Sequence, residues 1–196
     1  MLEKNENFLY FDAHFHLGDC LEQLRTLSLS KGREPSEQFP ANWAGCSCFH
    51  SPDEWNTLRP LRQAQGPQEL RTHLYLSYGL HPQSAGWINI KQCADFLEQL
   101  LQQNKLNAIG EAGFDYFSSE FKENTALQEE MFYIQLQLAL EYNMPMVIHA
   151  RKANNKLFEY SKQFKKLPAV LFHSFMGPAR EAQSLINHGI NAFFSF

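Results

Sequence analysis

The chain has 196 residues, 44% of them hydrophobic, which is enough to bury one substantial core, so we expect a single domain over residues 1–196. Its net charge of −4 excludes a protein that coats nucleic acid through overall charge. No run approaches the ~18 apolar residues of a membrane span, and the amino terminus lacks a secretory signal pattern. We therefore expect a cytoplasmic protein with no membrane partner.

Short apolar runs that predict β-strands recur along the chain, and each except the last is followed by a polar or helix-like segment. These runs cover residues 8–15, 44–49, 73–80, 106–114, 145–150, 169–175 and 191–196. Helical patterns cover roughly residues 90–104, 123–143, 154–165 and 178–188. Because alternating strands and helices build parallel sheets, the order predicts an α/β fold. Two polar stretches, 26–40 and 59–72, read as surface loops or insertions.

The clearest helix, residues 123–143, carries apolar residues at steps of three and four. They are Leu127, Met131, Ile134, Leu138 and Tyr142. This spacing predicts one apolar stripe along the helix.

The first strand ends with a histidine pair. His14 and His16 are two residues apart, so in an extended strand they project from the same face, and Asp12 lies two positions before them. Two neutral imidazoles at this spacing can bind one cation, while a carboxylate orients one ring. Alone, the pattern also fits a strand end with two polar residues facing water.

Polar residues follow several other runs in the same way. His81, Glu111, His149 and His173 each lie at or just after the carboxyl end of a predicted strand. In a parallel barrel these ends meet at one face, where active sites are built. Any one of these histidines could be an ordinary hydrogen-bonded residue near a sheet edge, but the set together predicts a pocket of chelating side chains.

Four histidines and a carboxylate suit a borderline divalent ion such as zinc or manganese, and they exceed what one zinc site needs. Two ions bridged by Glu111 would use them all, and ions held ~4 Å apart are a common clamp for attack on a phosphodiester. A shared water would then be the nucleophile. No nucleophile elbow, P-loop or Rossmann glycine pattern is present.

Five blocks in this order resemble the signature blocks of the TatD-type metal-dependent deoxyribonucleases of the amidohydrolase superfamily. They are FDAHFHL, YGLHP, IGEAGFDY, MPMVIHAR and FHSFMGP. The resemblance implies a TIM-type (β/α) barrel, a site for two divalent ions (Zn, Mn, Mg or Ni) and hydrolysis of phosphodiesters, with DNA or a small phosphodiester as substrate.

Carried over by position, the resemblance implies specific roles. The metal ligands would be His14, His16, Glu111, His149 and His173, with Glu111 bridging. His81 matches a pocket histidine that would contact the substrate phosphate or leaving group. Arg151 sits where the family has a residue facing the pocket, and its guanidinium could neutralise phosphate; a salt bridge at the barrel rim is the other reading of Arg151.

The barrel is expected to be incomplete, with about seven strands and the eighth missing. A (β/α)₈ fold typically takes ~250 residues, and the family's eighth strand carries an aspartate ligand that nothing here matches. The open edge would expose unpaired backbone groups, which a homo-oligomer could cover, although a monomer remains open.

Two functions therefore stay in view. In the first, the chain is an active nuclease whose missing carboxylate is supplied by a partner chain, by Asp12 or Asp115, or is dispensable. In the second, it is a truncated, catalytically impaired relative that binds metal or phosphate without turnover. An amidohydrolase acting on an amide or ester is a lesser rival, because Glu111 stands where many such enzymes use a modified lysine.

Overall fold

The computed structural model describes residues 10–15, 43–56 and 74–196. The two polar stretches predicted as loops, and His16, lie outside these residues. The described strands are β1 (Tyr10–Phe15), β2 (Trp43–Phe49), β3 (Leu74–Tyr78), β4 (Ala108–Asp115), β5 (Met146–Arg151), β6 (Val170–His173) and β7 (Ala192–Phe194). They form one sheet in chain order, and every neighbouring pair is parallel.

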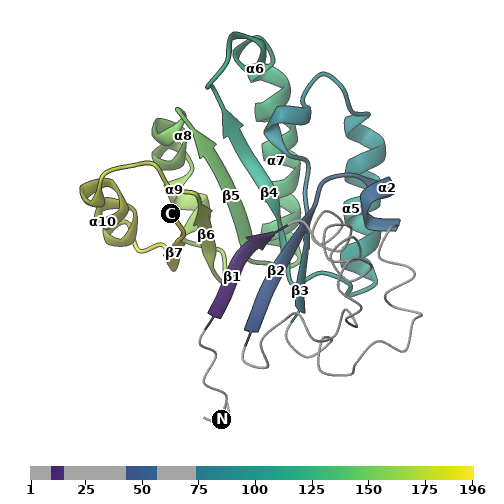
Figure 1. Cartoon of the computed structure of the whole chain (residues 1–196), viewed down its shortest axis with the longest axis horizontal. Helices are drawn as coiled ribbons and strands as arrows, with labels where there is room; N and C mark the ends of the chain where they lie inside the picture. Colours follow the sequence, from purple (N-terminus) through teal and green to yellow (C-terminus); the bar gives the residue numbers. More distant parts are fainter. Residues whose placement is uncertain (1–9, 16–42, 57–73) are drawn as a thin grey trace, which may run out of the picture.

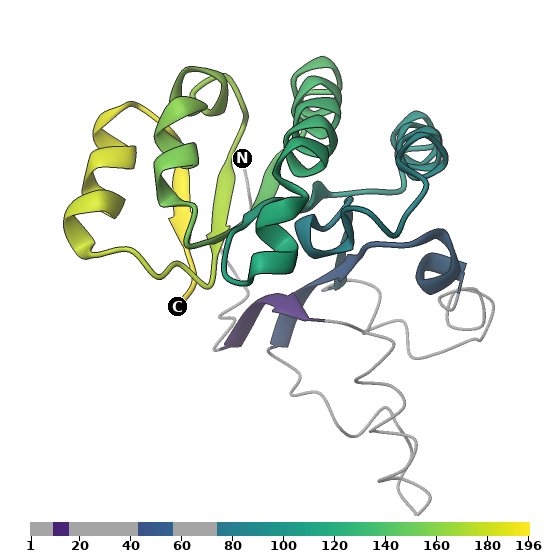
Figure 2. The same ribbon diagram turned by 90° about the horizontal axis from the view of Figure 1, so that it is seen from above.

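Helices follow most of the strands. They are α2 (Pro52–Asn56), the 3₁₀ helix η2 (Pro82–Ser84), α5 (Ile90–Gln102), α6 (Ser119–Glu123), α7 (Thr125–Glu141), α8 (Asn154–Glu159), α9 (Ser161–Phe164) and α10 (Ala179–Asn187). Figure 1 shows the strand arrowheads of β4 and β5 at one end of the molecule. Figure 2 shows the sheet bent into an arc, with α5, α7, α8 and α10 along its outer side.

The described strands thus form part of a barrel, because β1 and β7 are the two ends of the sheet and are not paired with each other in the described residues. The predicted α/β class and the incomplete barrel are confirmed. No helix in the described ranges combines the length and apolar character needed to cross a bilayer.

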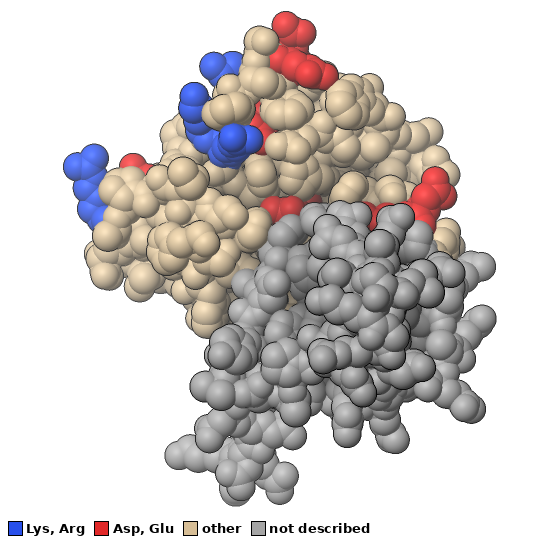
Figure 3. Space-filling view, viewed as in Figure 1, with Lys and Arg blue, Asp and Glu red and all other residues tan. Residues whose placement is uncertain are grey.

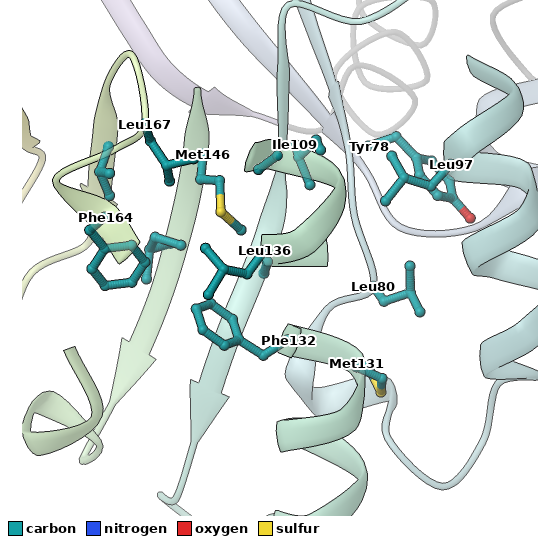
Figure 4. Packing of buried hydrophobic residues seen from close by; sticks show 14 of the residues in the cluster. Tyr78, Leu80, Leu97, Ile109, Met131, Phe132, Leu136, Met146, Phe164 and Leu167 are labelled. Atoms are coloured by element: carbon teal, nitrogen blue, oxygen red, sulfur yellow. The ribbon is translucent and has the colours of Figure 1, made fainter. Parts of the chain in front are cut away.

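The main core lies between the outer face of the sheet and the helices. It contains Ile109 and Met146 from the strands, Phe132 and Leu136 from α7, and Phe164 from α9, all completely buried (Figure 4). Phe132 packs edge-on against Phe164, with ring centroids 6.1 Å apart. Burial of these side chains holds the helices on the sheet.

A smaller apolar cluster fills the inner face. Cys46 and Cys48 of β2 pack there with Ala108 of β4 and Val147 of β5. Because side chains alternate along a strand, His149 follows Val147 on the same face. The inner face is therefore apolar at its base and becomes polar toward the carboxyl ends.

The predicted apolar stripe of α7 packs on the core, but it is only part of the buried face. Met131 is buried, and Leu127, Leu138 and Tyr142 are partly buried against the core. The fully buried residues of this helix are Gln128, Met131, Phe132, Gln135, Leu136 and Ala139. The buried face therefore extends beyond the predicted stripe and includes two glutamines, whose amides form hydrogen bonds to the backbone of Leu80 and Asp115. An apolar pattern cannot detect a buried face that contains such residues.

Candidate metal centre at the strand ends

Most of the polar side chains predicted to gather at the strand ends lie together. Glu111 belongs to β4, His149 to β5 and His173 to β6, while His81 is the residue that caps η2 just after β3. Parallel strands in chain order bring these positions to the same end of the sheet. The fold thus brings four residues that are far apart in the sequence into one cluster.

Two glycines allow β4 to lie close against β5 at this point. Gly110 and Gly113 both have φ of 146°, a region that other residues rarely adopt. A Cβ on Gly113 would lie 2.0 Å from the carbonyl oxygen of His149, and one on Gly110 would lie 2.4 Å from that of Val147. The close approach of the two strands places Glu111 beside His149.

Glu111 is the centre of the cluster and is only 5% exposed. Its Oε2 lies 3.5 Å from His81 Nε2, and its Oε1 lies 3.4 Å from His149 Nδ1. His173 Nε2 is 3.9 Å from the same Oε1. One ligand atom from each of His81, Glu111 and His149 lies within 4.8 Å of the others, which is close enough for a shared metal ion.

Asp115 supports this cluster from behind His149. Its carboxylate is fully buried, and its Oδ2 lies 3.1 Å from His149 Nε2. Gln83 Nε2 donates to the same oxygen at 2.8 Å, and the Phe117 N–H donates to Oδ1 at 2.9 Å. With three donors around it, Asp115 has little capacity left to bind an ion directly.

His173 is held by two hydroxyl groups. Its Nδ1 lies 3.1 Å from Ser195 Oγ, and its Nε2 lies 3.0 Å from Ser174 Oγ. Ser195 Oγ also accepts a hydrogen bond from the Ser174 N–H. The orientation of this imidazole therefore depends on the segment that follows β7.

The surroundings shift the pKa values of His81 and His149 in opposite directions. Burial lowers the pKa of His81 to about 4, although Glu111 opposes this shift. Burial also acts to lower the pKa of His149, but hydrogen bonds and charge attraction from Glu111 and Asp115 outweigh it and raise that pKa above its usual value. For Asp115, burial acts to raise the pKa, but hydrogen bonds from Gln83, Phe117 and His149 lower it overall.

The two buried glutamines of α7 hold the backbone that carries the site. Gln135 accepts from the N–H of Leu80 and donates to its carbonyl, at 2.8 and 3.1 Å. Gln128 does the same for Asp115, at 2.8 and 3.0 Å. Each glutamine thus fixes a residue at, or next to, a member of the cluster.

The donor set fits a divalent transition metal. Imidazole nitrogens and a carboxylate are the ligands that zinc and related ions prefer. When His149 is neutral and donates to Asp115, its Nδ1 carries a lone pair and faces a carboxylate oxygen 3.4 Å away. Two such acceptors repel unless a proton or a cation lies between them, so the arrangement is suited to a bound cation.

The other predicted site residues stand as follows. His14 belongs to β1, but its side chain lies outside what the structure describes, as does the whole of His16.

Arg151 is the last residue of β5. Its guanidinium carbon lies 3.6 Å from the ring centroid of Phe117, a residue that is 48% exposed. Figure 3 shows Lys and Arg side chains gathered near the carboxyl ends of β4 and β5. Arg151 and Lys152 are both exposed at this rim.

The sequence reasoning missed two residues. His50 directly follows β2, its ring centroid is 6.2 Å from that of His81, and its Nδ1 lies 3.2 Å from Glu54 Oε2. The strand-end rule that selected the other histidines would have found it. Gln83 was also missed, and no sequence signal distinguishes it from an ordinary loop glutamine.

An imidazole and carboxylate cluster at the carboxyl ends of a parallel, barrel-like sheet is typical of metal-dependent α/β enzymes. A family model described as TatD related DNase matches residues 11–196, and the chain belongs to this family. The resemblance seen in the sequence is therefore confirmed.

Relatives of known sequence agree with this assignment. An uncharacterised metal-dependent hydrolase of Mycoplasma pneumoniae is 28% identical over 191 residues, which cover 95% of this chain and 69% of that protein. The 3′-5′ ssDNA/RNA exonuclease TatD of Escherichia coli K12 is 33% identical over 135 residues, 68% of this chain and 50% of that protein. The aligned regions thus span from half to about two thirds of these relatives.

Two crystal structures share the fold. The Escherichia coli TatD homologue YJJV has a TM-score of 0.69 at 22% identity, over 93% of this chain and 66% of that one. A TatD family hydrolase from Entamoeba histolytica has a TM-score of 0.71 at 19% identity, over 93% of this chain and 64% of that one. The chain spans slightly less than two thirds of the length of both.

Proposed function

We propose that this protein is a metal-dependent hydrolase that cleaves phosphodiester bonds in DNA. The observation that carries this proposal is Glu111, a buried carboxylate with imidazole nitrogens of His81, His149 and His173 within 3.5, 3.4 and 3.9 Å. Relatives that are named 3′-5′ ssDNA/RNA exonuclease support a nucleic acid substrate, and one of them is the Escherichia coli protein described above.

The proposed ligands of two divalent ions (Zn, Mn, Mg or Ni) are His14, His16, Glu111, His149 and His173. Bound ions would lower the pKa of a water molecule and neutralise phosphate charge. His81 would donate a hydrogen bond to a phosphate oxygen or to the leaving group, and Arg151 would add positive charge at the rim. Phe117 holds the Arg151 guanidinium at this rim through their close contact.

A second candidate function is binding of metal or phosphate without turnover. The surroundings of Asp115 favour this second function. This residue could have replaced the aspartate that the resemblance places on an eighth strand, but it is fully buried and already accepts from Gln83, Phe117 and His149. If no other carboxylate takes that place, ions would bind but the attacking water would lack a proton acceptor.

Hydrolysis of a 3′-labelled single-stranded DNA separates the two candidates. We expect cleavage that stops with a chelator and returns with added manganese or magnesium. Glu111→Gln should lower the rate by at least about 10²-fold, the scale of removing one electrostatic contribution at a reacting centre. Glu130→Gln, at an exposed position of α7, is the matched control and should cleave like the parent.

The results have clear readings. A cleavage rate that the chelator does not change, or a Glu111→Gln variant that cleaves as fast as the parent, would contradict the proposal. Tight metal binding with no turnover of DNA or a generic phosphodiester at any of the four ions would support the second candidate instead.

A further inference from the structure

The histidines on the two sides of Glu111 have partners on their other ring nitrogens. In a neutral imidazole one nitrogen carries the proton and donates, while the other accepts, so the partner of one nitrogen determines the state of the second. His81 and His149 lie with ring centroids 4.7 Å apart. Their partners can therefore be compared directly.

The Nδ1 of His81 faces a donor. The backbone N–H of Gln83 donates to this nitrogen at 3.2 Å. Nδ1 can accept only through its lone pair, so the proton of the neutral ring is on Nε2. That N–H is the group turned toward Glu111 Oε2, 3.5 Å away.

The Nε2 of His149 faces an acceptor. Asp115 Oδ2 lies 3.1 Å from it, and an ionised carboxylate offers only lone pairs. The proton of this ring is therefore also on Nε2. The nitrogen turned toward Glu111 Oε1 is then the bare Nδ1, at 3.4 Å.

Gln83 connects the two arrangements. Its backbone N–H fixes His81, and its side-chain Nε2 donates at 2.8 Å to the same Asp115 oxygen that accepts from His149. Gln128 in turn holds the backbone of Asp115 from α7. The two rings are thus oriented by one connected set of hydrogen bonds.

We propose that Gln83 and Asp115 are positioning residues that hold both histidines in the Nε2–H tautomer while turning opposite nitrogens toward Glu111, which makes His149 a metal ligand through Nδ1 and His81 a hydrogen-bond donor. This inference rests on the proposed function and refines it, because three residues close enough to share an ion receive two different roles. Carboxylates or carbonyls that orient metal-binding histidines affect metal affinity in the same way in other sites.

Asp115→Asn is the sharpest test. The asparagine Oδ1 can still accept from the Phe117 N–H, and its NH₂ group then lies where Oδ2 was, facing His149 Nε2 and Gln83. The Gln83 side-chain amide can turn so that its Oε1 accepts from this NH₂ group. The asparagine amide donates, so the His149 proton should move to Nδ1, the nitrogen assigned to the metal. Asp95→Asn makes the same chemical change at an exposed position of α5 that pairs with Lys91, and it serves as the matched control.

The readout is the tautomer itself. Two-bond ¹H–¹⁵N spectra of metal-free protein labelled at histidine, recorded at alkaline pH where both rings are neutral, should show the Nε2–H form for His81 and His149 in the parent and in Asp95→Asn. In Asp115→Asn, His149 should show the Nδ1–H form and His81 should be unchanged. A parent with Nδ1–H at His149, or an Asp115→Asn variant without the change, would overturn the proposal.

Metal binding gives the second readout. Calorimetric titration with Zn²⁺ alone should show affinity roughly 10- to 100-fold lower in Asp115→Asn, the usual cost of losing such an orienting partner, and unchanged affinity in Asp95→Asn. Gln83→Ala keeps its backbone N–H, so His81 should keep its tautomer while zinc affinity falls by a smaller factor. Unchanged affinity in both site variants would contradict the assignment.

These measurements separate this inference from the proposed function. The tautomers and the zinc affinity are measured without hydrolysis, so a protein that shows both but cleaves nothing would refute the nuclease proposal alone. If Asp115→Asn does not fold, the tautomers of the parent and the zinc affinity of Gln83→Ala still test the inference. Gln83 is only partly buried, and its replacement leaves the backbone hydrogen bond to His81 in place.

Discussion

The two faces of the sheet come from the same strands but have different roles: the outer face packs against the helices, and the inner face carries the candidate metal site. The outer face packs Ile109, Phe114 and Met146 against Phe132 and Leu136 of α7. The inner face carries a small apolar cluster at its base and Glu111 and His149 near the carboxyl ends. Alternation along each strand lets one segment contribute to both, so stability and chemistry can be changed separately.

The separation is incomplete at α7. Met131 and Phe132 of this helix lie in the outer core, yet Gln128 and Gln135 form hydrogen bonds to the backbone of Asp115, at the end of β4, and of Leu80. The outer layer therefore both stabilises the sheet and fixes the backbone of the site. Variants at the two kinds of position should behave differently.

Phe132→Ala should produce the largest loss of stability. The ring is completely buried and lies 4.7 Å from both Phe114 and Tyr160 between centroids. We expect the free energy of unfolding, measured by urea denaturation, to fall by about 3–5 kcal/mol. Zinc affinity of the folded fraction should not change.

Tyr133→Ala is the control for this variant. Tyr133 is the next residue of the helix and is 57% exposed, so its loss should cost less than about 0.5 kcal/mol. Equal effects of the two substitutions would mean that the buried face of α7 is not the one described.

Gln135→Leu should be destabilising although it makes the helix more apolar. Leucine leaves the Leu80 N–H and carbonyl without their partners in a buried site, at about 1–3 kcal/mol for each unsatisfied group. We expect a loss of about 2–4 kcal/mol in urea denaturation, together with weaker zinc binding. Gln137→Leu, at an exposed position of the same helix, should be nearly neutral. A more stable Gln135→Leu variant would show that burial of apolar surface alone governs this face.

His81 should make stability depend on pH. Its pKa is about 4 in the folded protein against about 6.5 in the unfolded chain. Between these values the unfolded chain binds a proton there and the folded chain does not, so its contribution to the free energy of unfolding falls as the pH falls. The limit is about 1.4 kcal/mol per unit of pKa difference.

The comparison with His81→Asn isolates this effect, because His149, whose raised pKa acts in the opposite direction, is present in both proteins. The metal-free parent should lose stability relative to the variant as the pH is lowered from about 6.5 to 4. Denaturation curves at several pH values check this, and a constant difference would contradict the low pKa.

Arg151→Ala should have the smallest effect. The guanidinium is exposed and lies against Phe117, so its contact with a phosphate would be worth about 1 kcal/mol or less. We expect KM for single-stranded DNA to rise a few-fold while kcat is kept. Lys162→Ala, an exposed cation of α9, should leave both unchanged. A large fall in kcat would instead place Arg151 at the reacting atoms.

The sequence predicted the order of elements well because each is short and local. The helix at 123–143 corresponds to α7, and the runs at 106–114 and 145–150, which contain Glu111 and His149, correspond to β4 and β5. What the pattern of α7 did not reveal is the full width of its buried face, because glutamine is read as a surface residue by any hydrophobic pattern. Hydrogen bonds to the backbone of Leu80 and Asp115 explain why these glutamines are buried.

The cluster was predictable in membership but not in detail. Parallel strands explain why Glu111, His149 and His173 meet, and this follows from the order of the runs. The partner of each ring nitrogen does not follow from the order of the runs, because it depends on differences of a few tenths of an ångström in the distances between side chains. For this reason Asp115, considered first as a substitute metal ligand, is assigned a different role by its contacts with His149 and Gln83.

The hydroxyl of Ser195 links one candidate ligand to the edge strand of the sheet. It lies 3.1 Å from His173 Nδ1, and the Ser195 backbone bonds to Phe172 and Phe175. A shift of the backbone at Ser195 would therefore turn the imidazole of His173, so the edge of the sheet and the geometry of the candidate metal site are coupled.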